Sequence, residues 1–139
     1  MNNKKTILFV LNSLEQKFIL KKIESLSKKG YNCYVLVERN HNPFHFKNSN
    51  IKVYNSWKKY DVISILKILG RIFLNPFVVA SSFYKSITNE YDMLESLKIS
   101  IKTLPFFLIN PDVIHFEFAG LGLSYHNCFH LFDESKIFV

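Results

Sequence analysis

Cysteine, glycine and proline are all scarce in this sequence. Its 139 residues include two cysteines, four glycines and four prolines. Cys33 and Cys128 are too few for a disulfide scaffold or a four-cysteine zinc site, and they favour a reduced, cytosolic chain. The low glycine and proline contents exclude collagen-like and linker-like sequences.

Uninterrupted hydrophobic runs of membrane-spanning length are also missing. The most apolar long stretch, residues 62–84, contains Lys67, Arg71, Asn75 and Pro76. A spanning helix needs about 20 mostly apolar residues, and central charges are costly. We therefore expect two buried or interfacial helices, broken at Asn75–Pro76. Lys67 and Arg71 beside apolar side chains suit contact with an anionic membrane, and they also suit a buried helix with snorkelling cations.

Apolar residues are plentiful and positive charge is in excess. Apolar residues make up 48% of the chain and include 14 phenylalanines, which is enough to form a core and excludes disorder. The length predicts one domain over residues 1–139. Lysine and arginine number 18 against 11 acidic residues, a net charge of +7. Because no recognition-helix or RNP-like pattern accompanies this charge, we expect no nucleic-acid partner.

Short continuous apolar runs alternate with helical patterns along the chain. Such runs are typical of strands buried on both faces of a parallel sheet. The sequence predicts an α/β fold: a Rossmann-like open sheet of about five strands, in order 3-2-1-4-5, with helices on both faces. The expected strands are residues 6–11, 31–37, 51–54, 113–116 and 136–139, and the expected helices begin near Ser13, Asp61, Pro76, Glu90 and Leu123.

Two local patterns define the first helix. Ser13 with Gln16 forms a capping-box pattern, and Gly30 occupies the position after the helix, where a positive φ costs little. In the helix expected over residues 90–103, the apolar residues in register are Leu94, Leu97, Ile101 and Leu104.

Several kinds of site are excluded by what the loops lack. The turn after the first strand, residues 12–15, has no glycine, so Glu38 after the second strand does not indicate a dinucleotide site. No P-loop and no Gly-x-Ser-x-Gly elbow occurs. His126 and His130 are four residues apart, but no third ligand is evident. We expect no metal and no cofactor.

The region after the fourth strand is the strongest candidate for function. Ligands of open α/β sheets bind beyond the carboxyl ends of the strands, at the point where the strand order reverses. Here the loops 12–15 and 115–122 meet at that point. His115 ends the fourth strand and could act as a base or bind a sugar hydroxyl, or its ring could be satisfied by a backbone carbonyl. The other candidate binding residues in these loops are Asn12, Ser13, Glu15, Glu117, Gly120 and Gly122.

Four segments resemble the N-terminal half of GT-B glycosyltransferases. They look most similar to the family-4 enzymes of bacterial surface-polysaccharide synthesis, which open with a strand, a helix ending before Gly-Tyr or Gly-His, and a second strand. The segments are residues 5–10, 18–26, 29–31 and Pro111-Asp112-Val113-Ile114-His115-Phe116.

The resemblance implies that the chain is half of a GT-B fold, the acceptor-binding domain. His115, the turn through Gly120 and the loop after the first strand would line the acceptor side of a cleft. The helices over residues 61–84 would correspond to a segment that touches the membrane in some members. A nucleotide sugar would bind only through a C-terminal donor domain, which is missing here, so this chain alone would be inactive. We expect a cytoplasmic protein, at the inner face of the plasma membrane, acting on a glycan or lipid-linked acceptor.

Residues 136–139 form a final strand with nothing after it. A buried parallel strand normally leads into a loop and a covering helix. This favours a fragment of a longer protein over a small sheet that ends here. The alternative function is a non-enzymatic α/β binding module, either peripheral to a membrane or dependent on a partner.

Overall fold

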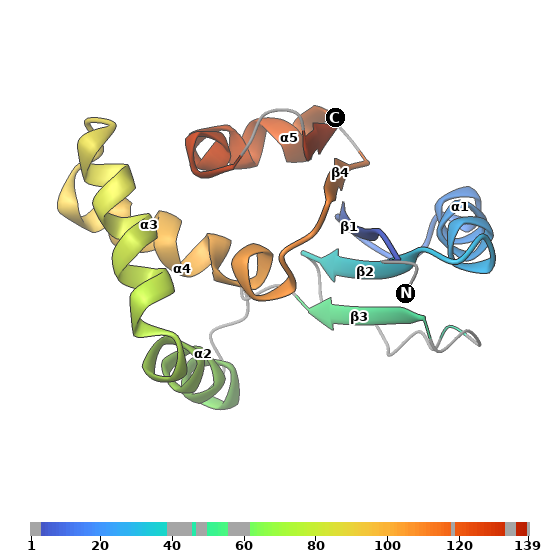
Figure 1. Cartoon of the computed structure of the whole chain (residues 1–139), viewed down its shortest axis with the longest axis horizontal. Helices are drawn as coiled ribbons and strands as arrows, with labels where there is room; N and C mark the ends of the chain where they lie inside the picture. Colours follow the sequence, from blue (N-terminus) through green and yellow to red (C-terminus); the bar gives the residue numbers. More distant parts are fainter. Residues whose placement is uncertain are drawn as a thin grey trace.

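The chain forms one parallel five-stranded sheet in the order β3-β2-β1-β4-β5, as predicted (Figure 1). The computed structural model describes residues 4–38, 46, 50–55, 62–117, 119–132 and 136–138. Every pair of neighbouring strands is parallel. The strands are β1 (Thr6–Leu11), β2 (Asn32–Val37), β3 (Ile51–Asn55), β4 (Val113–Phe116) and β5 (Ile137–Phe138).

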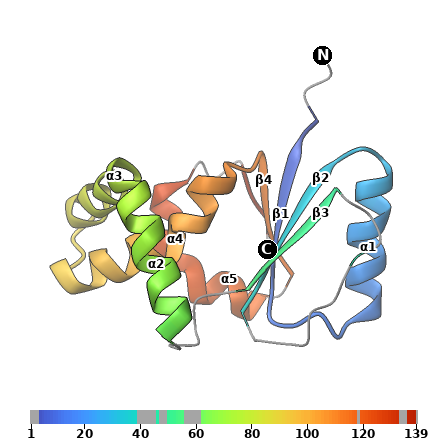
Figure 2. The same cartoon turned by 90° about the horizontal axis from the view of Figure 1, so that it is seen from below.

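Helices lie on both faces of the sheet, which confirms the Rossmann-like arrangement. Figure 2 shows α1 on one side of the sheet and the other helices on the opposite side. The connection from β1 to β2 crosses the sheet in one direction, and the connection from β3 to β4 crosses it in the opposite direction. Because both crossovers are right-handed, the helices of these two connections lie on opposite faces. The helices are α1 (Lys17–Lys28), α2 (Val62–Leu74), α3 (Pro76–Thr88), α4 (Met93–Ile109), α5 (Ala119–Tyr125) and the 3-10 helix η1 (His126–Leu131).

Alternate residues of the central strands build two separate cores. Phe9 points to the α1 side, where it packs with Ile19 and Ile23. Leu8 points to the other side and packs in a cluster with Phe106 of α4. This period of two is the reason that each strand reads as a continuous apolar run.

Asp112 fixes where β4 begins beside β1. The backbone N–H of Thr6 donates to the Asp112 carboxylate over 2.7 Å, and the Asp112 N–H donates to the Thr6 carbonyl over 2.9 Å. The Pro-Asp pair that precedes β4 in the sequence therefore has a structural role.

The start of α1 differs from the prediction. Gln16 is the N-cap and makes no side-chain cap bond, so the capping box on Ser13 was wrong. Leu14 is buried in the core beneath α1, which holds residues 12–16 as a loop before the helix. At the other end of the helix, Gly30 has φ +95°, as predicted.

The predicted turn through Gly122 was also wrong. The helix α5 already begins at Ala119, so that Gly120 and Gly122 are helical, and residues 126–131 form a 3-10 helix. Among the described glycines a positive φ occurs at Gly30 alone, so neither helical glycine is required by a turn.

The helix α4 is longer than predicted and buries only part of the predicted stripe, since Leu104 is fully buried. Asp92 caps it by accepting from the Glu95 N–H over 2.8 Å, and it continues through Pro105 to Ile109. Leu94 and Leu97 of the expected stripe are exposed. Within the described segments, no helix has the length and apolarity needed to cross a membrane. The predicted cap Asp61 lies outside the described residues.

Candidate functional site

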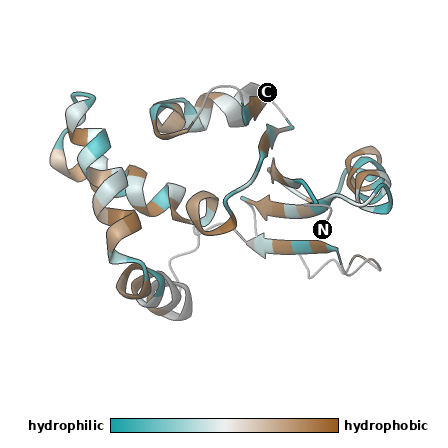
Figure 3. Ribbon diagram, in the orientation of Figure 1, coloured by the Kyte–Doolittle hydropathy of each residue, from teal (hydrophilic) through white to brown (hydrophobic). Residues whose placement is uncertain are grey.

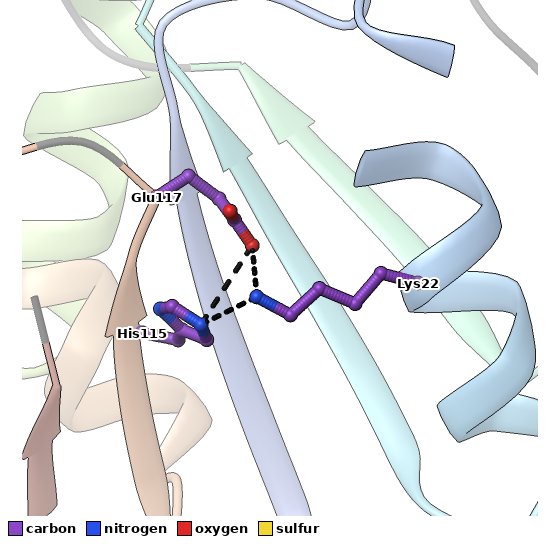
Figure 4. A network of polar contacts seen from close by, with 3 residues as sticks. All are labelled: Lys22, His115 and Glu117. Atoms are coloured by element: carbon purple, nitrogen blue, oxygen red, sulfur yellow. Dashed lines mark hydrogen bonds and ion pairs between the residues drawn. The ribbon is translucent and has the colours of Figure 1, made fainter. Parts of the chain in front are cut away.

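Three charged or titratable side chains meet where the strand order reverses. Lys22 reaches from α1 across the sheet to His115 on β4 and to Glu117, the residue after β4 (Figure 4). Its Nζ lies 2.7 Å from His115 Nε2 and 2.9 Å from Glu117 Oε1. His115 Nε2 and Glu117 Oε1 are 3.8 Å apart. We call these three residues the switch-point cluster.

The alternation of β4 directs His115 into this cluster. His115 pairs with Phe9 in the sheet, and the two rings are 5.6 Å apart on the α1 side. Ile114 and Phe116 point to the opposite face and join its core. The Glu117 N–H donates to the Val10 carbonyl over 3.3 Å, which extends the ladder and holds the carboxylate beside β1.

The cluster keeps the His115 ring neutral. The Lys22 ammonium has only donors, so His115 Nε2 must accept, and the ring proton belongs on Nδ1. Burial lowers the pKa of His115, and the Lys22 charge lowers it further, while the Glu117 carboxylate acts in the opposite direction. The Glu117 side chain is only 6% exposed and is balanced by Lys22. The site therefore offers a neutral imidazole and a carboxylate, each within hydrogen-bonding distance of the same ammonium.

The other predicted site residues are placed around the cluster or away from it. Asn12 and Ser13 are half-buried, and Glu15 is exposed, in the loop that follows β1. Gly120 and Gly122 belong to α5, which packs on the opposite face from α1 (Figure 2). The geometry thus brings together His115 and Glu117 and separates the helical glycines from Lys22.

The two predicted membrane-contact residues lie on α2. Arg71 is half-buried there, and the Lys67 side chain is outside the described residues. Figure 2 places α2 away from the sheet, on the side opposite α1.

Lys22 was missed because it was read as part of a solvated basic face. Its position gave a signal, since it lies three residues after Ile19 and four before Leu26, at the border of the apolar stripe. A long cation at such a border can cover the sheet with its stem and reach a strand end with its ammonium.

Glu38 lies at the end of β2, but its carboxylate is engaged with the Tyr125 side chain. Glu38 is nearly buried and shares a hydrogen bond with the Tyr125 side chain. Burial raises the pKa of Tyr125, and the Glu38 charge and hydrogen bond raise it further. The Glu38 carboxylate therefore has a structural role.

His126 and His130, which follow α5, lie in different surroundings and do not form a common site. His126 is exposed, whereas His130 stacks on Tyr91 at 5.3 Å and its Nε2 lies 3.3 Å from Ser86 Oγ. Burial lowers the pKa of His130. In the part of the chain that the structure describes, no three His, Cys, Asp or Glu side chains are grouped to hold a metal ion.

Comparison with known proteins adds no further constraint on the site. No family model, no curated protein and no solved structure matches this chain.

Proposed function

We propose that this chain is the acceptor-side domain of a GT-B glycosyltransferase. In this proposal, a sugar is transferred from a nucleotide-sugar donor to a glycan or lipid-linked acceptor when the domain is joined to a donor domain. The observation that carries the proposal is the switch-point cluster, which places His115 where open α/β sheets bind ligands. The sequence resemblance around residues 111–116 supports it.

The cluster has the chemistry that an acceptor hydroxyl needs. A sugar hydroxyl both donates and accepts, so it can donate to His115 Nε2 and accept from Lys22 once the ammonium shifts toward Glu117. A neutral imidazole can also receive the hydroxyl proton as the oxygen bonds to the donor sugar, while the bond between that sugar and the nucleotide phosphate breaks and the nucleotide leaves with the bonding electrons. His115 is therefore assigned as the base, with Lys22 and Glu117 orienting the acceptor.

The donor side is assigned to a second domain. The loop after β1 has no glycine that would let the backbone approach a pyrophosphate. We place the reaction at the inner face of the plasma membrane, where a lipid-linked acceptor would be available to the cluster.

The proposal predicts that a glycan binds this chain through His115. We expect His115→Ala to weaken binding of an acceptor glycan about tenfold, because the hydrogen bond from the sugar hydroxyl to His115 Nε2 is lost. Isothermal titration calorimetry against a panel of neutral oligosaccharides and nucleotide sugars measures this. His126→Ala, an exposed histidine away from the cluster, is the matched control and should bind like the wild type.

Two outcomes would count against the proposal. One is glycan binding that His115→Ala leaves unchanged. The other is tight binding of nucleotide sugars without binding of glycans, which would assign the domain to the donor side. Binding of neither ligand would favour the non-enzymatic module, which the exposed apolar surface of α2 and α3 also suits.

A further inference from the structure

The helices α3 and α4, which pack along each other, bury hydroxyl side chains. The buried residues of α3 are Ser82 and Ser86, and the buried residues of α4 include Ser96 and Ser100. Ser86 donates to the Ser82 carbonyl over 2.9 Å, and Ser100 donates to the Ser96 carbonyl over 2.8 Å. These hydroxyls are therefore satisfied within their own helices, and many of the larger apolar side chains remain on the outside.

An apolar groove runs along the outside of this helical hairpin. Its volume is about 530 Å³, and its lining residues within the described segments are all apolar. They include Pro76, Val79 and Phe83 on α3 and Met93, Leu94 and Leu97 on α4. We call this feature the hairpin groove. A groove of this kind accepts the apolar face of another helix.

The helix α2 carries an exposed apolar face of the matching kind. Leu66, Leu69 and Phe73 are separated by three and four residues, so they share one side of the helix, and they are 62%, 56% and 85% exposed. We call these three residues the α2 stripe. Figure 3 shows hydrophobic colouring along α2 and the adjoining part of α3. Because a helix of thirteen residues is marginal in water on its own, covering the stripe would stabilise α2.

We propose that two copies of this chain form a two-fold dimer in which each places its α2 stripe in the hairpin groove of the other. In such a dimer the same surface of both copies takes part, and each contact occurs twice. The chain meets this requirement because it carries both halves of the contact side by side. Ile72 belongs to α2 and also lines the groove, so stripe and groove form one continuous surface.

The exposed apolar area matches what a dimer of this kind needs. The exposed members of the stripe and the groove number six, from Leu97 at 43% to Phe73 at 85%, and Leu74 and Phe77 at the adjoining corner add two more. At roughly 100 Å² for each covered side chain, they supply about 800 Å² from each copy. This area is that of a standard protein interface.

The charged side chains near the groove have both signs. Glu90 and Asp92 are exposed in the turn between α3 and α4, and Lys98 is exposed on α4 beside Leu97. A surface of mixed charge does not select an anionic ligand, and it lets a second copy approach without the repulsion that charges of one sign would cause.

The dimer contact goes beyond the proposed function and uses a different side of the molecule. The switch-point cluster lies on the α1 side of the sheet, whereas α2, α3 and α4 lie on the opposite side (Figure 2). Pairing through these helices therefore leaves the cluster accessible in both copies.

Sedimentation velocity over a range of concentrations tests the dimer. Interfaces of this size span micromolar to picomolar affinity, and we expect a Kd of about 10 µM because ordering α2 offsets part of the gain. The chain should therefore be a monomer at about 1 µM and a dimer above about 100 µM. Unfolding measured at about 1 µM reports on the monomer.

One variant on each half of the contact tests the pairing of stripe with groove. Phe73→Glu on the stripe and Leu94→Glu in the groove should each weaken dimerisation at least tenfold, because a charge would be buried in an apolar contact. The matched controls are Phe18→Glu on α1 and Leu123→Glu on α5, where the native side chains are 64% and 76% exposed, and both should dimerise like the wild type.

Mixing the two variants distinguishes this pairing from others. An equimolar mixture of Phe73→Glu and Leu94→Glu should dimerise more strongly than either variant alone, because one of its two contacts is then made by native residues. Circular dichroism checks that each variant is folded. If a glutamate variant does not fold, Phe73→Ser and Leu94→Ser take its place, with the same expected direction.

Four results would overturn the proposal. They are a wild-type chain that stays monomeric up to about 500 µM, equal dimerisation by the stripe and groove variants, a mixture no stronger than its components, and a monomer that binds lipid vesicles through Phe73 instead. His115→Ala should dimerise like the wild type, so failure of the dimer and failure of the sugar site are distinguishable.

Discussion

Replacing Phe106 with alanine should lower the free energy of unfolding by about 3–5 kcal/mol, the range for a buried phenylalanine. Phe106 is almost fully buried on α4 and packs against rings from three other segments. Its ring centroid lies 6.5 Å from Phe116 on β4, 5.5 Å from Tyr125 on α5 and 5.5 Å from Phe132. Removal of the Phe106 ring would therefore leave a cavity where α4 packs against the sheet. Urea denaturation followed by circular dichroism measures the loss.

Phe77→Ala is the control for that experiment. Phe77 on α3 is exposed, so its removal should change stability by no more than about 0.5 kcal/mol. A loss below about 1 kcal/mol for Phe106→Ala would show that α4 is not anchored to the sheet through this ring.

Replacing Ser100 with leucine should destabilise the protein by about 1–3 kcal/mol, although it makes α4 more apolar. Ser100 is fully buried, and its hydroxyl donates to the Ser96 carbonyl. A leucine side chain would overfill the close contact that serine permits. The same denaturation experiment detects the effect.

Leu97→Ser, about one turn earlier on α4, makes the opposite change at an exposed position and is the matched control. Leu97 is exposed, so its replacement should change stability by no more than about 0.5 kcal/mol in water. If Leu97→Ser costs more stability than Ser100→Leu, the assignment of Ser100 to the buried side of α4 and of Leu97 to its exposed side is wrong.

The sheet could be predicted because its strands carry their own signal. A strand buried on both faces is apolar at nearly every position, so residues 6–11 and 113–116 were recognisable without knowledge of their neighbours. The order of the strands then followed from the handedness of the crossovers.

The buried faces of the helices could not be predicted in the same way. Leu94 and Leu97 repeat at helical spacing, which normally indicates the core, yet they are exposed. Ser96 and Ser100 look like surface residues and are buried. Periodicity shows that a helix has an apolar face, but it does not show whether that face contacts the same chain or another medium.

The candidate site was predicted in part. His115 and Glu117 were placed by the rule that ligands bind at the switch point, which depends on topology alone. Lys22 belongs to a helix nearly a hundred residues away in the chain, and its contact depends on the tilt of α1 over the sheet. Gly120 and Gly122 were misplaced because glycine is read as a turn residue even where a helix accommodates it.

We propose that the switch-point cluster binds an acceptor hydroxyl, and NMR of the histidine side chains provides a direct test. Long-range proton–nitrogen spectra of the free chain should show His115 neutral, with the proton on Nδ1 and a pKa below the ordinary value of a histidine. Adding an acceptor glycan should shift the His115 Nε2 signal and leave that of exposed His126 unchanged. A His115 protonated on Nε2 in the free chain, or a glycan that binds without moving the His115 signal, would contradict the account.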